Sequence, residues 1–270
     1  MPQQWRLVSA RVATGTEHMA TDYWLLEQLI AGHLPPTLRF YQWSPPALSL
    51  GYHQKAWPHH WQTLTWQGRP VDLVRRPTGG RAVLHQGDLT YAIAMPLTVA
   101  RQAAYQQICD ALIAAWQQLG VSLRYGTAGS GYRHQANCFA LATAADLVTD
   151  RGYKLIGSAQ LRRDRYLLQH GAIRLWPNAE FHSQVFNDHA ASIAERPTEI
   201  PASPDADFLV KLQTSIQQAL ARSLGITFVE LPLSAAEIAD IEENSTAFAN
   251  LAGPWPKTLT SGPGDTGLHP

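Results

Sequence analysis

Cysteines, membrane-length apolar runs and signal-peptide features are scarce or missing in this sequence. Only two of its 270 residues are cysteines, Cys109 and Cys138, and they lie in different contexts, so a disulfide framework is excluded. No apolar run approaches the ~20 residues of a membrane span, and Gln3, Gln4 and Arg6 interrupt any signal-peptide core. These absences predict a reducing compartment, and we expect a cytoplasmic protein.

An excess of charge of one sign is also missing. The 21 basic and 21 acidic side chains cancel, so no overall field attracts nucleic acid or an anionic membrane. The 11 histidines are scattered and neither cysteine has the spacing of a metal site. We therefore expect no nucleic-acid partner, no membrane partner and no metal ion. Apolar residues make up 45 % of the chain, which is enough for a continuous core.

Helices are predicted where apolar residues recur at helical spacing. The first begins after a capping box formed by Thr14 and Glu17 and ends near Ala31 and Gly32, before Pro35-Pro36. Three further helices are expected over 100–119, 204–224 and 234–251. Cys109 lies on the apolar stripe of the second of them, which predicts a buried, inert thiol.

Strands outnumber helices in the predicted pattern. They are expected over 5–12, 38–43, 48–51, 71–75, 89–95, 121–125, 145–149, 153–160, 167–175 and 227–233. Residues 55–70 predict a short helix and a loop. The pattern indicates an α/β or α+β fold with mixed, largely antiparallel sheets flanked by helices. We expect a catalytic domain over 1–230, a helical extension over 231–253 and a disordered tail over 254–270.

The segment 75–85, Arg-Arg-Pro-Thr-Gly-Gly-Arg-Ala-Val-Leu-His, lies between two predicted strands. Its paired glycines favour a tight connection whose backbone approaches another group closely. Its three arginines suggest that this group carries negative charge. An ordinary hairpin with a solvated basic turn explains the same residues.

Two further residues are candidates for chemistry. Cys138 follows a glycine-rich polar loop, where a nearby cation from Arg133, His134 or Lys154 would lower its pKa. Lys154 precedes Gly157-Ser158-Ala159, and such small residues let a ligand lie against the strand while the ammonium polarises a carbonyl. The alternatives are an incidental loop cysteine and a lysine that points to solvent.

The histidines at positions 85 and 170 can each orient a partner or shuttle a proton, or be hydrogen-bonded core residues. The order of four motifs is more specific than any one of them. Arg-Arg-x-Thr-Gly-Gly-Arg-Ala-Val-Leu-His is followed by Asp-Leu-Thr-Tyr-Ala, Lys-x-x-Gly-Ser-Ala-Gln and Leu-Leu-Gln-His-Gly-Ala-Ile. This order resembles the biotin/lipoate protein ligase superfamily over roughly residues 5–230. Within it the sequence is most similar to lipoate–protein ligase A and the LipM-type octanoyltransferases.

The resemblance implies a fold like the catalytic domain of these ligases and a pocket for an acyl chain. It implies that Lys154 contacts the acyl carbonyl region. It also implies substrate-binding roles for Arg76, Thr78, Gly79, Gly80, Arg81, His85, Gly157, Ser158, Ala159, His170 and Gly171.

The branches of this superfamily differ in how they activate the acyl group. Ligases form an acyl-adenylate with ATP, whereas the transferases use a cysteine thioester and need no cofactor. In one transferase branch the cysteine immediately precedes a phenylalanine upstream of the lysine motif, as Cys138 does here. The resemblance therefore implies that Cys138 and Lys154 are catalytic.

The expected activity is octanoyl transfer from acyl carrier protein to a lysine of a lipoyl domain. Expected acceptors are the glycine cleavage H protein and the acyltransferase subunits of 2-oxoacid dehydrogenases. Two alternatives remain: a lipoate–protein ligase that requires ATP and magnesium, and a non-catalytic protein that binds the acyl group or its carrier.

Overall fold

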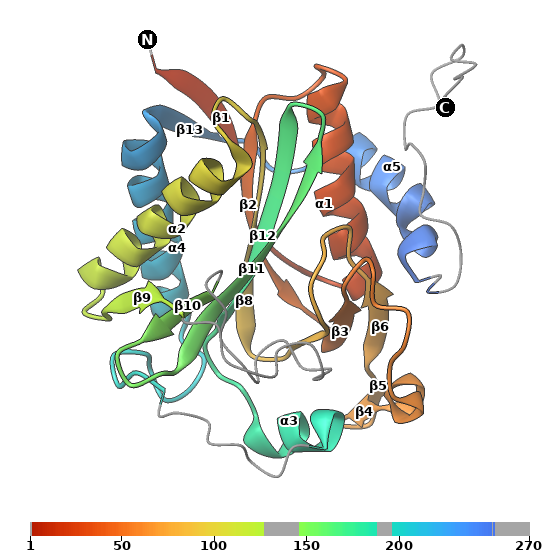
Figure 1. Ribbon diagram of the computed structural model, residues 1–270. Helices are drawn as coiled ribbons and strands as arrows, with labels where there is room; N and C mark the ends of the chain where they lie inside the picture. The colour runs from red at the N-terminus through yellow and green to blue at the C-terminus, as the bar shows by residue number, and fades with distance from the viewer. Residues whose placement is uncertain (1, 127–145, 188–195, 250, 252–270) are drawn as a thin grey trace.

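One mixed sheet of eight strands forms the centre of the molecule (Figure 1). The computed structural model describes residues 2–126, 146–187, 196–249 and 251. The β13–β1 and β1–β2 pairs are parallel and the remaining pairs are antiparallel. In sheet order the strands are β13 (Ile226–Glu230), β1 (Gln3–Ala13), β2 (Thr37–Trp43), β8 (Asp88–Pro96), β12 (Tyr166–Arg174), β11 (Lys154–Arg163), β10 (Asp146–Thr149) and β9 (Leu123–Tyr125). The predicted mixed, largely antiparallel fold is confirmed.

Helices cover both faces of this sheet (Figure 1). Alternate residues of β8 point to opposite faces, as strand geometry requires. Leu89, Tyr91 and Ile93 join the core beneath α2 (Arg101–Gln118) and α4 (Ala206–Leu224). Ala92 and Ala94 join the core beneath α1 (Gly15–Ile30). None of the described helices combines the length and apolar character needed to cross a membrane.

The predicted capping box at the start of α1 is confirmed. The Thr14 hydroxyl accepts a hydrogen bond from the Glu17 amide, and the Glu17 carboxylate accepts one from the Thr14 amide. The helix ends at Ile30 and Gly32 follows with φ +77°. The cap satisfies backbone groups of the first turn of the helix that carries Met19 and Asp22.

The C-terminal helix α5 (Ala235–Ser245) and the 3₁₀ turn η3 (Thr246–Phe248) pack on the outer side of α1 (Figure 1). Ile241 and Phe248 are buried in the same core cluster as α1. The Arg6 guanidinium binds both carboxylate oxygens of Glu237, and Trp24 donates to Asp240. The described part of the predicted 231–253 extension therefore shares its apolar core with the rest of the chain.

A small sheet in the order β6 (Asp72–Arg75), β3 (Ala47–Leu50), β7 (Val83–His85) lies beside the central one (Figure 1). The segment 75–85 is not a hairpin, because β6 and β7 pair with opposite sides of β3. Sequence analysis did not predict β7, the β4 (Thr65–Trp66) and β5 (Arg69–Pro70) pair, or α3 (Ala179–Phe186). The 3₁₀ helix η1 (His59–Thr63) matches the short helix expected within 55–70.

Candidate active site

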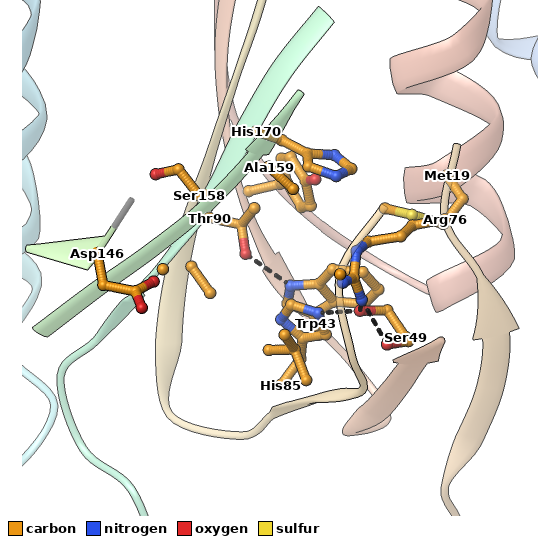
Figure 2. Close-up of a pocket in the computed structure, with 16 residues that line it drawn as sticks. Met19, Trp43, Ser49, Arg76, His85, Thr90, Asp146, Ser158, Ala159 and His170 are labelled. Carbon is orange, nitrogen blue, oxygen red and sulfur yellow. Dashed lines mark hydrogen bonds between the residues drawn. The ribbon is translucent and has the colours of Figure 1, made fainter. Parts of the chain in front are cut away.

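A pocket lies between the central sheet and the small sheet (Figure 2). Strands β2, β8, β10, β11 and β12 supply one wall, while β3, β7 and the segment after β6 supply the other. The lining residues are Met19, Tyr41, Trp43, Ser49, Arg76, Gly80, Val83, His85, Thr90, Asp146, Gly157, Ser158, Ala159, His170, Gly171 and Ala172.

The pocket brings together most residues that the sequence singled out. Those that line it are Arg76, Gly80, His85, Gly157, Ser158, Ala159, His170 and Gly171. Four do not line it, namely Thr78, Gly79, Arg81 and Lys154. Cys138 and the glycine-rich loop before it lie outside the described residues, as does the tail over 254–270. The roles assigned to all these residues stay predictions.

Half of the residues that line the pocket were not predicted from the sequence. The missed residues are Met19, Tyr41, Trp43, Ser49, Val83, Thr90, Asp146 and Ala172. Thr90 and Ala172 lie within motifs that carried the family resemblance, but nothing local to them predicts a shared cavity. The pairing of distant strands brings them together.

Asp22 of α1 is the centre of a buried polar cluster behind the pocket. Its Oδ2 accepts hydrogen bonds from the Tyr41 hydroxyl and from His170 Nδ1, each at 2.8 Å. Its Oδ1 lies 3.1 Å from Nε of Arg39. Burial favours a higher pKa for the Asp22 carboxyl, but Arg39 and these two donors lower it below its ordinary value. Asp22 is therefore a buried carboxylate that orients three neighbours.

His170 connects this cluster to the segment after β6. Burial lowers its pKa, so the ring is neutral with its proton on Nδ1, toward Asp22. Its Nε2 accepts from the Thr78 hydroxyl at 2.6 Å. Thr78 is fully buried, so its predicted place in the binding loop is explained by this anchor. His170 is both a hydrogen-bonded core histidine and a lining residue.

His85 belongs to a second polar cluster. Its Nδ1 donates to Asp88 at 2.8 Å, and its Nε2 lies 2.8 Å from the Ser49 hydroxyl. The Trp43 ring stacks on the imidazole at 3.8 Å, and Trp43 Nε1 donates to Thr90. Figure 2 shows Trp43, His85 and Ser49 gathered on one side of the pocket. The imidazole is fixed on both edges and one face.

Two of the three arginines of the segment 75–85 bind backbone carbonyls. Arg76 donates to the carbonyl oxygens of Ser49, Gly79 and Arg81, and Arg75 donates to those of Gly51 and Gln54. Carbonyl oxygens carry partial negative charge, so the guanidinium groups hold the connection in shape. These contacts give Arg75 and Arg76 a structural role, and the inference from sequence that the arginines indicate a negatively charged ligand stays a prediction for Arg76, which lines the pocket.

Of the paired glycines, only Gly80 lies where a larger residue would meet a neighbouring atom. Gly80 has φ +96°, and a Cβ there would lie 2.7 Å from Arg76 Nη2. A Cβ on Gly51 would lie 1.9 Å from the Gly80 carbonyl oxygen, so these two backbones touch. For Gly79 no described atom lies within 4 Å of such a Cβ. The close approach predicted for both glycines is found at Gly80, and its partner is the protein backbone.

Ser158 and Gly171 line the pocket but also contact Tyr91, which belongs to the core on the other face of the sheet. The Ser158 hydroxyl is hydrogen-bonded to the Tyr91 hydroxyl at 2.8 Å, and Tyr91 belongs to the core beneath α2. A Cβ on Gly171 would lie 2.5 Å from both the Ser158 hydroxyl and the Tyr91 ring. Small residues are needed here to seat Tyr91.

Lys154 forms a buried ion pair at one end of the pocket. Its Nζ lies 2.8 Å from Oδ2 of Asp146, and both side chains are about 95 % buried, at 4 % and 5 % exposure. A strand irregularity between β10 and β11 places Lys154 opposite Val148, while Asp146 pairs with Gly157. Asp146 lines the pocket, so its carboxylate separates the Lys154 ammonium from the pocket.

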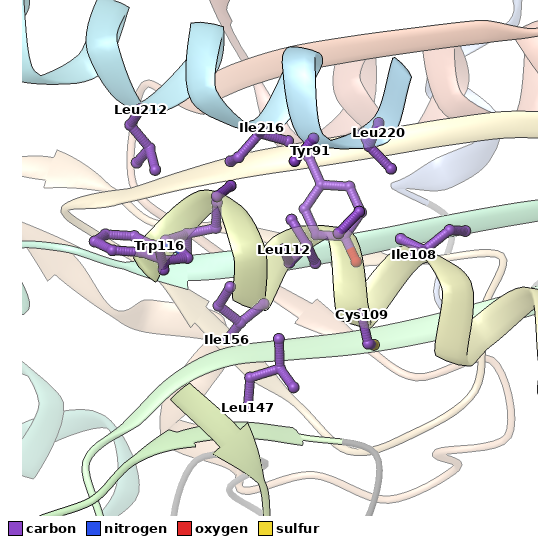
Figure 3. Close-up of a cluster of buried hydrophobic side chains, with 14 of the residues drawn as sticks. Tyr91, Ile108, Cys109, Leu112, Trp116, Leu147, Ile156, Leu212, Ile216 and Leu220 are labelled. Atoms are coloured by element: carbon purple, nitrogen blue, oxygen red, sulfur yellow. The ribbon is translucent and has the colours of Figure 1, made fainter. Parts of the chain in front are cut away.

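Cys109 is a buried core residue, as its helical position predicts (Figure 3). It is fully enclosed among Tyr91, Ile108 and Leu112 in the core beneath α2. Burial raises the pKa of its thiol to about 12, and an un-ionised thiol is a poor nucleophile.

A family model and the sequences of known proteins indicate the same family for this chain. The sequence model of the lipoyl protein ligase A/B catalytic domain matches residues 14–224. Octanoyltransferase LipM of Oceanobacillus iheyensis is 30 % identical over 94 % of this chain and 98 % of its own length. Octanoyltransferase LipM of Carboxydothermus hydrogenoformans is 40 % identical, over 63 % of this chain and 65 % of its own length.

Solved structures agree at the level of the fold. A lipoate-protein ligase A bound with ATP superposes with a TM-score of 0.71 at 19 % identity, covering 91 % of this chain and 95 % of its own. A putative lipoate protein ligase of T. acidophilum with bound lipoic acid gives 0.70 at 19 % identity, covering 90 % and 94 %. The domain model matches most of the chain, and the Oceanobacillus iheyensis relative aligns almost end to end, which shows that this chain belongs to the lipoyl protein ligase A/B catalytic domain family.

Proposed function

We propose that this protein is an octanoyltransferase of protein lipoylation, which moves an octanoyl group from acyl carrier protein to a lysine of a lipoyl domain. One observation carries the proposal: relatives named octanoyltransferase LipM align along nearly the whole chain. That of Clostridioides difficile, for example, is 33 % identical over 92 % of this chain and 97 % of its own length. The pocket supports it, because small residues of β11 and β12 leave space for a thin aliphatic chain.

The proposed reaction has two transfer steps. The Cys138 thiolate attacks the carbonyl carbon of the carrier thioester, the carrier C–S bond breaks, and the carrier thiol leaves with the proton that Cys138 gave up. The acceptor amine then attacks the enzyme thioester, the bond to Cys138 breaks, and the amine proton returns to the thiolate. Each step exchanges one acyl bond for another, so neither requires ATP or a metal ion.

The Lys154 ammonium, which is paired with Asp146, is the proposed source of positive charge for the reaction. The ammonium favours the thiolate form of a nearby cysteine and stabilises the oxyanion that forms at the carbonyl. Asp146 holds the ammonium at 2.8 Å and limits where it can point. The acceptor lysine must react as the neutral amine although its free pKa is near ~10.4, so its deprotonation is the harder half of the reaction.

Mass spectrometry and a transfer assay test the proposal together. Incubation with octanoyl-carrier protein and no acceptor should add one octanoyl group to Cys138. Adding a glycine cleavage H protein or another lipoyl domain should then move the group to the acceptor. Cys138→Ser should abolish the transfer, whereas Cys109→Ala, the matched control at the buried thiol, should retain it.

Two results would overturn the proposal. If octanoate with ATP and magnesium supports modification of the acceptor while Cys138→Ser retains full activity, the protein is a ligase. If every combination of donor and acceptor fails while octanoate binds, the protein is a non-catalytic acyl-binding member of the family.

A further inference from the structure

Five pocket residues form a single row across five strands of the central sheet. The strand registers pair each one with the next, and all five line the pocket. In order they are Asp146 of β10, Gly157 of β11, Ala172 of β12, Thr90 of β8 and Tyr41 of β2. The row therefore runs perpendicular to the strands, from the Lys154–Asp146 pair toward α1.

From Gly157 onward the residues of this row grow in size. Gly157, Ala172 and Thr90 present small side chains, so they form the floor of a groove, and the Tyr41 ring stands at its end. Neighbouring strands are about 4.8 Å apart, which places Thr90 about 10 Å and Tyr41 about 14 Å from Gly157. On the other side, Val83 of the small sheet faces the groove.

The end of the groove is held rigidly. The Tyr41 hydroxyl donates to Asp22 at 2.8 Å, and the Arg39 guanidinium lies 4.0 Å from the ring centroid. Met19 of α1 packs in the same buried cluster as Tyr41, and each is only 1 % exposed. Figure 2 shows Met19 and Asp146 on opposite sides of the pocket. A ligand that enters beside Asp146 meets Met19 and Tyr41 last.

We propose that Met19 and Tyr41 are the residues that limit the length of the acyl chain. This inference rests on the proposed function, in which the acyl carbonyl lies beside the Lys154–Asp146 pair. An extended alkyl chain advances about 1.3 Å per carbon, given C–C bonds of about 1.5 Å, so an octanoyl group spans about 9 Å. That length covers the floor from Gly157 to Thr90. Each added pair of carbons extends the chain by a further ~2.5 Å, toward the tyrosine ring and the methionine.

The test is transfer from carrier proteins loaded with acyl groups of six, eight, ten and twelve carbons. Met19→Ala shortens the end stop without touching the hydrogen bonds of Tyr41. It should raise the ratio of kcat/KM for the ten-carbon donor over the eight-carbon donor by about tenfold, the size of effect that one or two methylenes have in a pocket. Ala172→Val adds bulk to the middle of the floor and should shift the preference toward six carbons.

Met95→Ala is the matched control, because it truncates a buried methionine on the opposite face of the sheet, in the core beneath α2. It should reduce stability and leave the ratio unchanged. A ratio of rates is independent of the fraction of enzyme that is folded, so a destabilised variant still answers the question.

Failure of the inference and failure of the proposed function give different results. If the wild-type protein transfers octanoyl groups and neither Met19→Ala nor Ala172→Val changes the length preference, the inference is wrong. If no donor supports transfer, the function is wrong, and calorimetric binding of octanoate, decanoate and dodecanoate tests the end stop directly. Met19→Ala should then favour the longer acids, and unchanged relative affinities would refute the inference.

Discussion

Polar side chains around the pocket are oriented by partners that are distant in the sequence. Asp22 accepts hydrogen bonds from Tyr41 and from His170, 148 positions away, and His85 is hydrogen-bonded to Ser49, 36 positions away. A buried polar atom that loses its partner costs more free energy than its hydrogen bond contributes, so each member depends on the others. The walls of the pocket are rigid for this reason.

The Lys154–Asp146 pair gives the first prediction. Asp146→Asn removes the carboxylate that neutralises a buried ammonium, and we expect the free energy of unfolding to fall by about 3 kcal/mol. The double variant Asp146→Asn with Lys154→Met should recover much of that loss, because no buried charge then remains at this pair. Urea unfolding of the four proteins measures the coupling, and strictly additive losses would contradict it.

At the scale of elements, the segment that joins β6 to β7 is the distinctive feature. It passes from one side of β3 to the other and is held by the carbonyl contacts of Arg76 and by the Thr78–His170 hydrogen bond. Its residues are therefore placed on the pocket by the protein itself, before any ligand binds.

The paired glycines of this segment give the second prediction. Gly80→Ala forces a side chain into the left-handed region and against Arg76, and should cost about 1–3 kcal/mol of stability. Gly79→Ala meets no described atom within 4 Å and serves as the matched control, with a change near zero. Thermal unfolding of both variants measures the difference. Equal losses of stability would show that the backbone conformation of Gly80 does not require glycine.

At the scale of the whole molecule, the C-terminal helix contributes to the core that supports α1. Deleting 233–270 removes Ile241 and Phe248 from that core. Each such side chain contributes about 1.5–3 kcal/mol when buried, so a loss of about 4 kcal/mol is expected. Deleting only 254–270, the tail that the sequence predicts to be disordered, is the control, and that prediction implies an unchanged unfolding midpoint. A stable protein ending at residue 232 would show that the helix is dispensable.

Stability should also depend on pH, because two buried histidines are neutral in the folded protein. Burial and the neighbouring Arg39 lower the pKa of His18 to about 3, and burial lowers that of His170. The unfolded chain takes up protons on both rings below about pH 6.5, while the folded protein does not. Stability is therefore complete above that pH and falls below it, by up to about 1.4 kcal/mol per pH unit for each histidine.

The measurement is denaturant unfolding between pH 7 and pH 4. His18→Gln keeps a donor for the Gln42 carbonyl and an acceptor for Arg39 but cannot be protonated, so it should reduce the slope. His33→Gln removes an exposed histidine and is the matched control. A slope that is unaffected by His18→Gln would rule out this contribution.

Local sequence was sufficient for the long elements and for the family. The capping box at Thr14, the apolar stripes of α2 and α4, and the apolar runs of β8 and β12 depend on neighbours along the chain, so they could be predicted locally. The ordered motifs from Arg75 to Ile173 indicated the family before any fold was known. Strands of two or three residues, such as β4 and β7, carry too few positions to show a period and were missed.

Only the tertiary structure decided which residues share the pocket. Asp146, Gly157, Ala172, Thr90 and Tyr41 come from five strands, and their alignment depends on the register of four strand pairs. Two of these pairs, β12–β8 and β2–β8, join strands distant in the sequence, and their register depends on which faces are buried together in the folded protein. The sequence determined a lipoyl ligase–like fold with a lysine and a small-residue strand. The packing of α1 and the small sheet against the central sheet decided that the small residues line the pocket and that Lys154 lies behind Asp146.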